Sequence, residues 1–391
     1  MPDRSAEVFE KFDIWPPSPE PVDVNILTDG LPEPDVRFIE ACYEIAQGIV
    51  RESKRRRNGE SRFTHPTNVA HFVKMAGCKP HVIAAAILHD TVDEPIRLLI
   101  EEKGKDAEIN EEELGKFVHG EILKATDETG YDRDLAELVY KIVLVLTHVD
   151  ADRFYEGIGE IFSHYDYDVR LISVAIKLAD RLHNIRTIEN YVDEDRLYQC
   201  FKNVILLNYA KALLTNIKAK GHQHPLKSVD DEITKAIELL FKKCGKATFQ
   251  VLQSLTHAER SDSNVFPVLA YLSLGLEKYH HQKGGLDEIT DGTLEIGVSI
   301  PNLFHGIIHK YERKLYRDHE AFQKIVDNEL EYCKDIFSNE HLTDDELLVA
   351  IHYKDALALG EVVALLLYKE GYVVSGVDSL HRDGGFDGQK Q

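Results

Sequence analysis

The sequence has no apolar run long enough to cross a membrane. A membrane-spanning helix needs about 20 consecutive apolar residues, whereas the apolar stretch from Ala356 to Tyr368 is shorter and carries Glu361. The N-terminal residues are acidic and rich in proline, and they lack the basic-then-apolar order of a secretory signal peptide. These absences lead us to expect a cytoplasmic protein that does not bind membranes.

Positive charge is also scarce. The chain has 46 lysines and arginines against 68 aspartates and glutamates, which gives a formal net charge of −22. Nucleic acids and anionic membrane surfaces both attract positive charge, so this balance argues against non-specific binding to either. A small anionic substrate is still compatible with it, because such a substrate responds to the local field of its cleft.

The cysteines give no sign of a disulfide framework. There are five of them, they are widely scattered, and no two form a Cys-x-x-Cys pair. We therefore expect reduced thiols, as is usual in cytosolic proteins.

Apolar residues at helical spacing are abundant, and they predict an all-α protein. Repeated prolines within residues 1–34 predict an extended lead-in with little structure of its own, and Asp35 is the expected N-cap of the first helix. We expect a first helical domain over 35–220, a helical accessory domain over 225–375 and a flexible tail over 376–391.

Individual helices follow from the same spacing and from turn signals. An alternating apolar pattern over residues 293–300 could instead form a short strand. The predicted helices cover 36–51, 66–77, the stretch from 80 onward, 135–147, 169–188, 193–218, 229–243, 264–280, 302–314, 317–337 and 343–368.

One buried stretch ends in an unusual group of acids. The apolar run up to Leu88 is followed by His89 and Asp90, and then by Asp93 and Glu94 before Pro95. If the helix continues, the three carboxylates share one face at its negative C-terminal end, where both their mutual repulsion and the macrodipole oppose them. This arrangement predicts a bound cation.

A second polar group lies on the predicted helix 169–188. Asp180, His183, Asn184 and Thr187 fall at offsets 0, 3, 4 and 7, which places them on one stripe of an otherwise apolar helix. A buried carboxylate needs a partner. Asp180 could find it in a cation or, alternatively, in the neighbouring Lys177 or Arg181.

Taken in order, three motifs resemble those of a known family. His65-Pro66, then His89-Asp90, then Lys177-Leu-Ala-Asp-Arg-Leu-His-Asn184 resemble the HD-domain metal phosphohydrolases, and among them the hydrolase domain of RelA/SpoT-type alarmone enzymes. The resemblance covers about residues 36–200. It implies an all-α HD-domain helical bundle, followed here by a second, mostly helical region.

The resemblance also implies a set of site residues. One divalent metal, usually Mn²⁺, would be held by His65, His89, Asp90 and Asp180, a set of imidazoles and carboxylates that suits a first-row ion. Asp93 and Glu94 match the acidic pair that positions or deprotonates the attacking water, and Arg56, Asn184 and Thr187 match residues that bind the nucleotide. His183 is interpreted as structural.

The chain departs from the family pattern at two places. The family usually has Glu followed by Asp where this chain has Asp93 and Glu94, so each carboxylate changes its reach by one methylene. A misplacement of about 1 Å can cost on the order of 10²-fold in rate. Ser61-Arg62-Phe63 also replaces the usual Pro-Tyr-Ile ahead of His65.

These features predict a Mn²⁺-dependent enzyme that removes the 3′-pyrophosphate of the guanosine alarmones (p)ppGpp. Because no synthetase-like segment follows residue 200, we expect only degradation. Two alternatives stay open: the same site could act on adenosine alarmones or on the 2′-phosphate of NADPH, or the chain could be a non-catalytic regulatory module. Its C-terminal helices could form a homo-oligomer or bind a protein partner.

Overall fold

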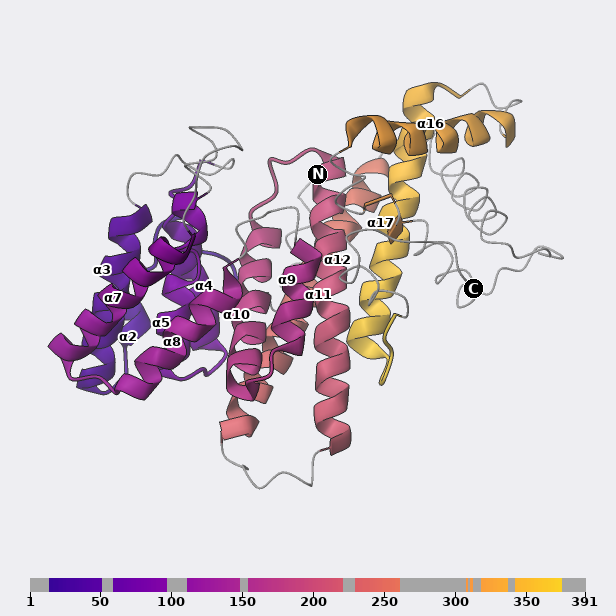
Figure 1. Ribbon diagram of the computed structural model, residues 1–391. Coiled ribbons are helices and arrows are strands. Elements are labelled where there is room, and N and C mark those ends of the chain that lie inside the picture. Colours follow the sequence, from indigo (N-terminus) through magenta and orange to yellow (C-terminus); the bar gives the residue numbers. More distant parts are fainter. Residues whose placement is uncertain are drawn as a thin grey trace. The chain divides into compact units, whose positions relative to one another are not determined.

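The computed structural model is helical wherever its placement is defined, and no strand occurs among the residues it describes (Figure 1). The all-α prediction is therefore confirmed. The predicted strand at 293–300 and the predicted helix at 264–280 lie outside the described residues. The structure describes residues 14–50, 59–96, 111–147, 154–220, 229–260, 307–308, 310–311, 318–336 and 342–374.

The chain divides into two units. Unit 1 consists of Met1–Asn190 and Ala212–Cys244, and unit 2 of Tyr191–Lys211 and Gly245–Gln391. Helices α11 (Asp193–Lys220) and α12 (Val229–Arg260) therefore each contribute a segment to both units. The domain boundaries expected near residues 220 and 225 fall between these two helices and stay a prediction.

Part of the proline-rich lead-in is attached to unit 1. The backbone N–H of Ser18 donates to Asn68 Oδ1 and that of Val22 to Thr67 Oγ1, both on α4 (Thr64–Met75). A short helix, α2 (Val24–Thr28), follows and is capped by the carboxylate of Asp23. These contacts give residues 14–28 a fixed position beside α4.

Helices α3 to α5 form the first half of the unit 1 core. Helix α3 (Glu33–Val50) begins before Asp35, which lies in its first turn; the predicted N-cap is therefore wrong. Helix α4 ends near Gly77, whose φ of +82° suits glycine because it has no Cβ. Helix α5 (Pro80–Leu88) has proline in its first turn and is buried from His81 to Leu88.

The second half of the core is formed by α7 (Glu111–Thr129), α8 (Arg133–Leu146), α9 (Phe154–Ser163) and α10 (Tyr167–Arg186). Asp132 and Asp166 cap α8 and α10, each accepting hydrogen bonds from two backbone N–H groups. The predicted helices at 135–147 and 169–188 are confirmed, whereas α9 was not predicted. Helices α4, α8 and α9 pack against α10, and α4 and α3 pack against α5.

Unit 2 contains α16 (His319–Ile336) and α17 (Asp344–Tyr368), as predicted. Thr343 and Glu346 form a capping box at the start of α17. No helix in the described part of the chain is long and apolar enough to span a membrane.

Unit 2 also encloses a ring of buried charges. Lys310 donates to Glu329 and Asp355, each over 2.8 Å, and Lys354 donates to Glu329 over 2.6 Å. The Tyr311 hydroxyl donates to Asp355 over 3.0 Å. All five side chains are at most 2% exposed, and the two lysines neutralise the two acids. Such a ring stabilises one arrangement of α16 and α17, because any shift would leave a buried charge without its partner.

Candidate metal centre

Three helices bring two histidines and one aspartate together. His65 lies in the first turn of α4, His89 is the C-cap of α5, and Asp180 lies in the middle of α10. Their ligand atoms all lie within 4.8 Å of one another, and all three side chains are buried. His65, His89 and Asp180 could therefore hold a metal ion.

His89 is oriented by the helix that carries it. Its Nδ1 lies 2.7 Å from the carbonyl oxygen of Ala86. Because a carbonyl only accepts, Nδ1 must carry the proton, and Nε2 is left with its lone pair. Nε2 is buried and has no hydrogen-bond donor among the described residues. A buried acceptor of this kind fits a metal ligand, and the carbonyl is the usual type of partner for the other ring nitrogen.

His65 is oriented by His183. The two Nδ1 atoms lie 3.0 Å apart, so one ring donates to the other, and His183 is completely buried. The Nε2 of His65 is thereby directed toward the carboxylates, 3.3 Å from Asp180 Oδ1 and 3.6 Å from Asp90 Oδ2. The sequence interpretation of His183 as structural did not include this contact, although its offset of three from Asp180 was the available signal.

Asp180 is held by a lysine and an amide. Lys177 Nζ lies 2.9 Å from Oδ2, and the Asn184 amide donates to Oδ1 over 2.5 Å. Burial by itself would raise the pKa of this carboxyl, but Lys177 and His65 outweigh it and lower the pKa well below the ordinary value. Asp180 is therefore an anion at neutral pH. Of the two predicted alternative partners, Lys177 makes the contact, whereas Arg181 lies over the ring of Phe154.

Asp90 lies at the edge of the three-residue group. Its Oδ1 is 3.3 Å from His89 Nε2, and its Oδ2 is 3.6 Å from His65 Nε2. The side chain is 27% exposed, in contrast to the other three predicted ligands. It is therefore the member of the set that is open to solvent.

From the sequence, we considered an α5 that continues through the acids after Asp90. In the structure, α5 ends before them. Helix α5 ends at Leu88, and the Thr91 backbone N–H and hydroxyl both donate to the Leu88 carbonyl, which terminates the helix. Residues 93–96 are helical again, so Asp93 and Glu94 lie in a new turn. The condition on which three carboxylates would share one face, that α5 continues through them, is therefore not met.

Glu94 is buried and forms an ion pair with Arg62. The arginine side chain is only 14% exposed, so both charges are largely shielded from water. Arg62 precedes α4 in the chain and was not predicted as a functional residue. The signal for it was present, since a basic residue replaces the tyrosine that is usual in this turn.

The structure places the three predicted nucleotide-binding residues in different surroundings or does not describe them. Arg56 lies outside the described residues. Asn184 contacts Asp180, as described above, and is therefore adjacent to the metal-ligand group. Thr187 is the C-cap of α10, and its hydroxyl is 3.1 Å from the carbonyl oxygen of His183. This contact is a hydrogen bond at the helix terminus, and nucleotide binding by Thr187 stays a prediction.

Known proteins resemble this chain over part of its length. It is 30% identical over 165 residues to a probable GTP pyrophosphokinase of Mycobacterium leprae, an alignment that covers 42% of this chain and 18% of the relative. It is 29% identical over 158 residues to the GTP pyrophosphokinase of Streptomyces coelicolor, covering 39% and 15%. For the GTP pyrophosphokinase rsh of Brucella suis the identity is 30% over 146 residues, covering 37% and 16%.

The chain resembles RelA/SpoT-type enzymes. This likeness spans less than a fifth of the length of each of these relatives. Their name describes a pyrophosphokinase that uses GTP, and it does not describe a hydrolase. No family model matches the chain, and no solved structure matches it.

Proposed function

We propose that unit 1 is a Mn²⁺-dependent pyrophosphohydrolase that removes the 3′-pyrophosphate of the guanosine alarmones (p)ppGpp and leaves GDP or GTP. The observation that carries this proposal is the convergence of His65, His89 and Asp180, with Asp90 beside both histidines. Two imidazoles and two carboxylates form a ligand set suited to Mn²⁺ and similar ions. When bound, such an ion lowers the pKa of a water molecule and offsets the charge of the phosphate under attack.

The residues around the ligands set their protonation. The Ala86 carbonyl keeps the Nε2 lone pair of His89 available, and His183 holds the ring of His65. Lys177 and His65 keep Asp180 ionised, and Lys177 and Asn184 each contact one of its two oxygens. These partners reduce the reorganisation needed to bind a cation, because each ligand atom is already directed to the same point.

The acidic pair would act on the attacking water in two different ways. The carboxylate of Glu94 is already engaged in an ion pair with Arg62. We therefore assign proton acceptance to Asp93 and water orientation to Glu94. Arg56, Asn184 and Thr187 would bind the nucleotide, with Arg56 stacking on the guanine base.

The similarity to GTP pyrophosphokinases supports a guanine nucleotide as the substrate. A different nucleotide is the second candidate, and the Arg62–Glu94 pair is the observation that favours it. This pair joins the two places where the chain departs from the family pattern, so both could have changed together to accept adenosine alarmones or NADPH.

The experiment is a turnover screen with the purified full chain. Pyrophosphate release from ppGpp, and phosphate or pyrophosphate release from pppApp and NADPH, would be measured with Mn²⁺ and after its removal by a chelator. Asp90→Ala should abolish turnover, whereas Asp127→Ala, at an exposed aspartate on α7, should not change it. The proposal is rejected if Mn²⁺ is bound and ppGpp is not cleaved; turnover that persists in Asp90→Ala rejects this site.

A further inference from the structure

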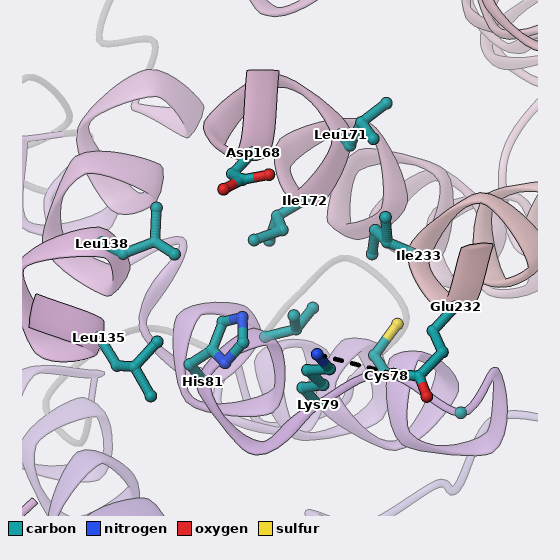
Figure 2. Close-up of a pocket in the computed structure, with 12 residues that line it drawn as sticks. Cys78, Lys79, His81, Leu135, Leu138, Asp168, Leu171, Ile172, Glu232 and Ile233 are labelled. Atoms are coloured by element: carbon teal, nitrogen blue, oxygen red, sulfur yellow. Dashed lines mark ion pairs between the residues drawn. The ribbon is translucent and has the colours of Figure 1, made fainter. Parts of the chain in front are cut away.

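A cavity of about 230 Å³ lies within unit 1, and none of its lining residues is a candidate metal ligand. The connection between α4 and α5 encloses it, together with α8, α10 and α12 (Figure 2). An engineered apolar cavity of about 150 Å³ stays dry and binds benzene. This cavity therefore has room for a larger ring system. Its aliphatic lining is formed by Val82, Leu135, Leu138, Leu171, Ile172 and Ile233.

The cavity contains one buried polar side chain that lacks a partner. His81, in the first turn of α5, is 9% exposed and makes no hydrogen bond within the described residues. Burial and the charge of Lys79 lower the pKa of His81 to about 4, so the ring is neutral at physiological pH. A neutral imidazole offers one donor and one acceptor. Because buried polar groups are normally paired, this ring is a natural anchor for a ligand.

The other polar groups of the lining include one cation, Lys79, which is paired with an acid. Lys79 and Glu232 face each other, with Nζ and Oε2 3.7 Å apart, so their charges offset one another (Figure 2). Burial raises the pKa of the Cys78 thiol to about 12, which keeps it protonated. Asp168 adds a negative charge at the start of α10. These groups disfavour phosphates and other anions, so the cavity differs in chemistry from a nucleotide site.

Two helices connect the cavity to the candidate metal centre. His81 and His89 lie eight residues apart on α5, and Ile172 and Asp180 lie eight residues apart on α10. Eight residues of α-helix span about 12 Å. Each helix thus lines the cavity with one turn and positions a candidate metal ligand about two turns further on, so a displacement of either helix at the cavity would move a ligand.

We propose that this cavity is a regulatory site for a small, neutral, mostly apolar molecule that carries one hydrogen-bonding group, and that its occupancy changes the metal centre through α5 and α10. The binding half of the proposal is independent of the enzyme activity, whereas the regulatory half rests on the proposed function. The aliphatic lining selects the apolar body, and His81 selects the polar group.

The first test uses two probes of nearly the same shape. Indole has an N–H donor and indene has none. We expect saturable binding of indole to the full chain by ligand-observed NMR, and a rise in Tm of about 3 °C at ten times its Kd. Indene should bind about tenfold more weakly, because it cannot donate to His81. In His81→Leu this difference should disappear.

The second test determines whether the cavity is where indole binds. Leu138 is partly exposed on α8, so Leu138→Trp can fill the space from the accessible side without rebuilding the core. This variant should lose indole binding, and the control Tyr165→Ala, at a side chain that is 93% exposed, should keep it. Circular dichroism would verify that Leu138→Trp folds; Ile233→Phe provides a second filling variant. No saturable binding to the wild type, or binding that persists in both filled variants, overturns the site.

The third test measures coupling to the metal directly. The Mn²⁺ dissociation constant, determined by electron paramagnetic resonance, should change at least about fivefold when indole is saturating, and Mn²⁺ should change the indole affinity by the same factor. An unchanged Mn²⁺ affinity overturns the regulatory half. If Mn²⁺ affinity responds to indole while no alarmone is cleaved, the proposed function fails, whereas the binding site and its coupling to the metal centre stand.

Discussion

The guanidinium of Arg62 is paired with the buried carboxylate of Glu94, and these residues mark the two places where the chain departs from the RelA/SpoT pattern. An arginine in place of the usual tyrosine thus lies against a glutamate in place of the usual aspartate. The second acid of the reversed pair therefore has a counter-charge at the other position that departs from the pattern.

We expect Arg62→Met to destabilise the protein by about 3 kcal/mol and to lower kcat, because a buried carboxylate would lose its partner. Arg62→Met combined with Glu94→Gln should recover most of the stability but not the activity. Urea denaturation and steady-state kinetics would measure both. Effects of the two substitutions that simply add would contradict this coupling.

The contact between His183 and His65 leads to a prediction about metal affinity. Replacing His183 with phenylalanine removes the ring nitrogen that orients His65, so Mn²⁺ affinity should fall by about 10- to 100-fold. Titration calorimetry would measure it. The matched control is His119→Phe on α7, whose ring contacts Glu137 away from the ligand group and whose loss should leave Mn²⁺ binding unchanged.

His81 should make the stability of unit 1 depend on pH. Its pKa falls from 6.5 to about 4 on folding, chiefly through burial, so the unfolded chain binds more protons between these values. Stability is then fully present above pH 6.5 and decreases as the pH falls toward 4, with a loss of about 2 kcal/mol by pH 5. His81→Leu should remove this component of the dependence. Urea denaturation at pH 7.5 and pH 5 would test it, and an unchanged slope in the variant would refute it.

Replacing any one of the buried charged residues of unit 2 by a neutral residue should strongly destabilise the protein. Lys310→Met leaves Glu329 and Asp355 under-compensated in a fully buried site, and it should cost about 3–5 kcal/mol. Lys334→Met removes a lysine that pairs with Asp344 at the surface, and it should cost less than about 1 kcal/mol. Thermal unfolding of the two variants would compare them. Equal losses would mean that the ring contributes nothing beyond an ordinary ion pair.

Helix positions were predictable because helix formation depends mainly on local spacing and on residues near the ends. The apolar periodicity located α8, α10 and α17 within a few residues. It failed at the end of α5, where the Thr91 hydroxyl takes the Leu88 carbonyl, and at the short helix α9, which lay between stronger patterns.

The sequence by itself determined which residue types could bind a metal: two histidines and a set of carboxylates in motifs that resemble a known family. Only the tertiary structure decided which of these side chains converge and which other residues contact and orient them. His65, His183 and Arg62 acquire their contacts from residues far along the chain, and such contacts depend on how helices pack. The cavity around His81 has the same origin, because four separate segments enclose it and no local pattern encodes their meeting.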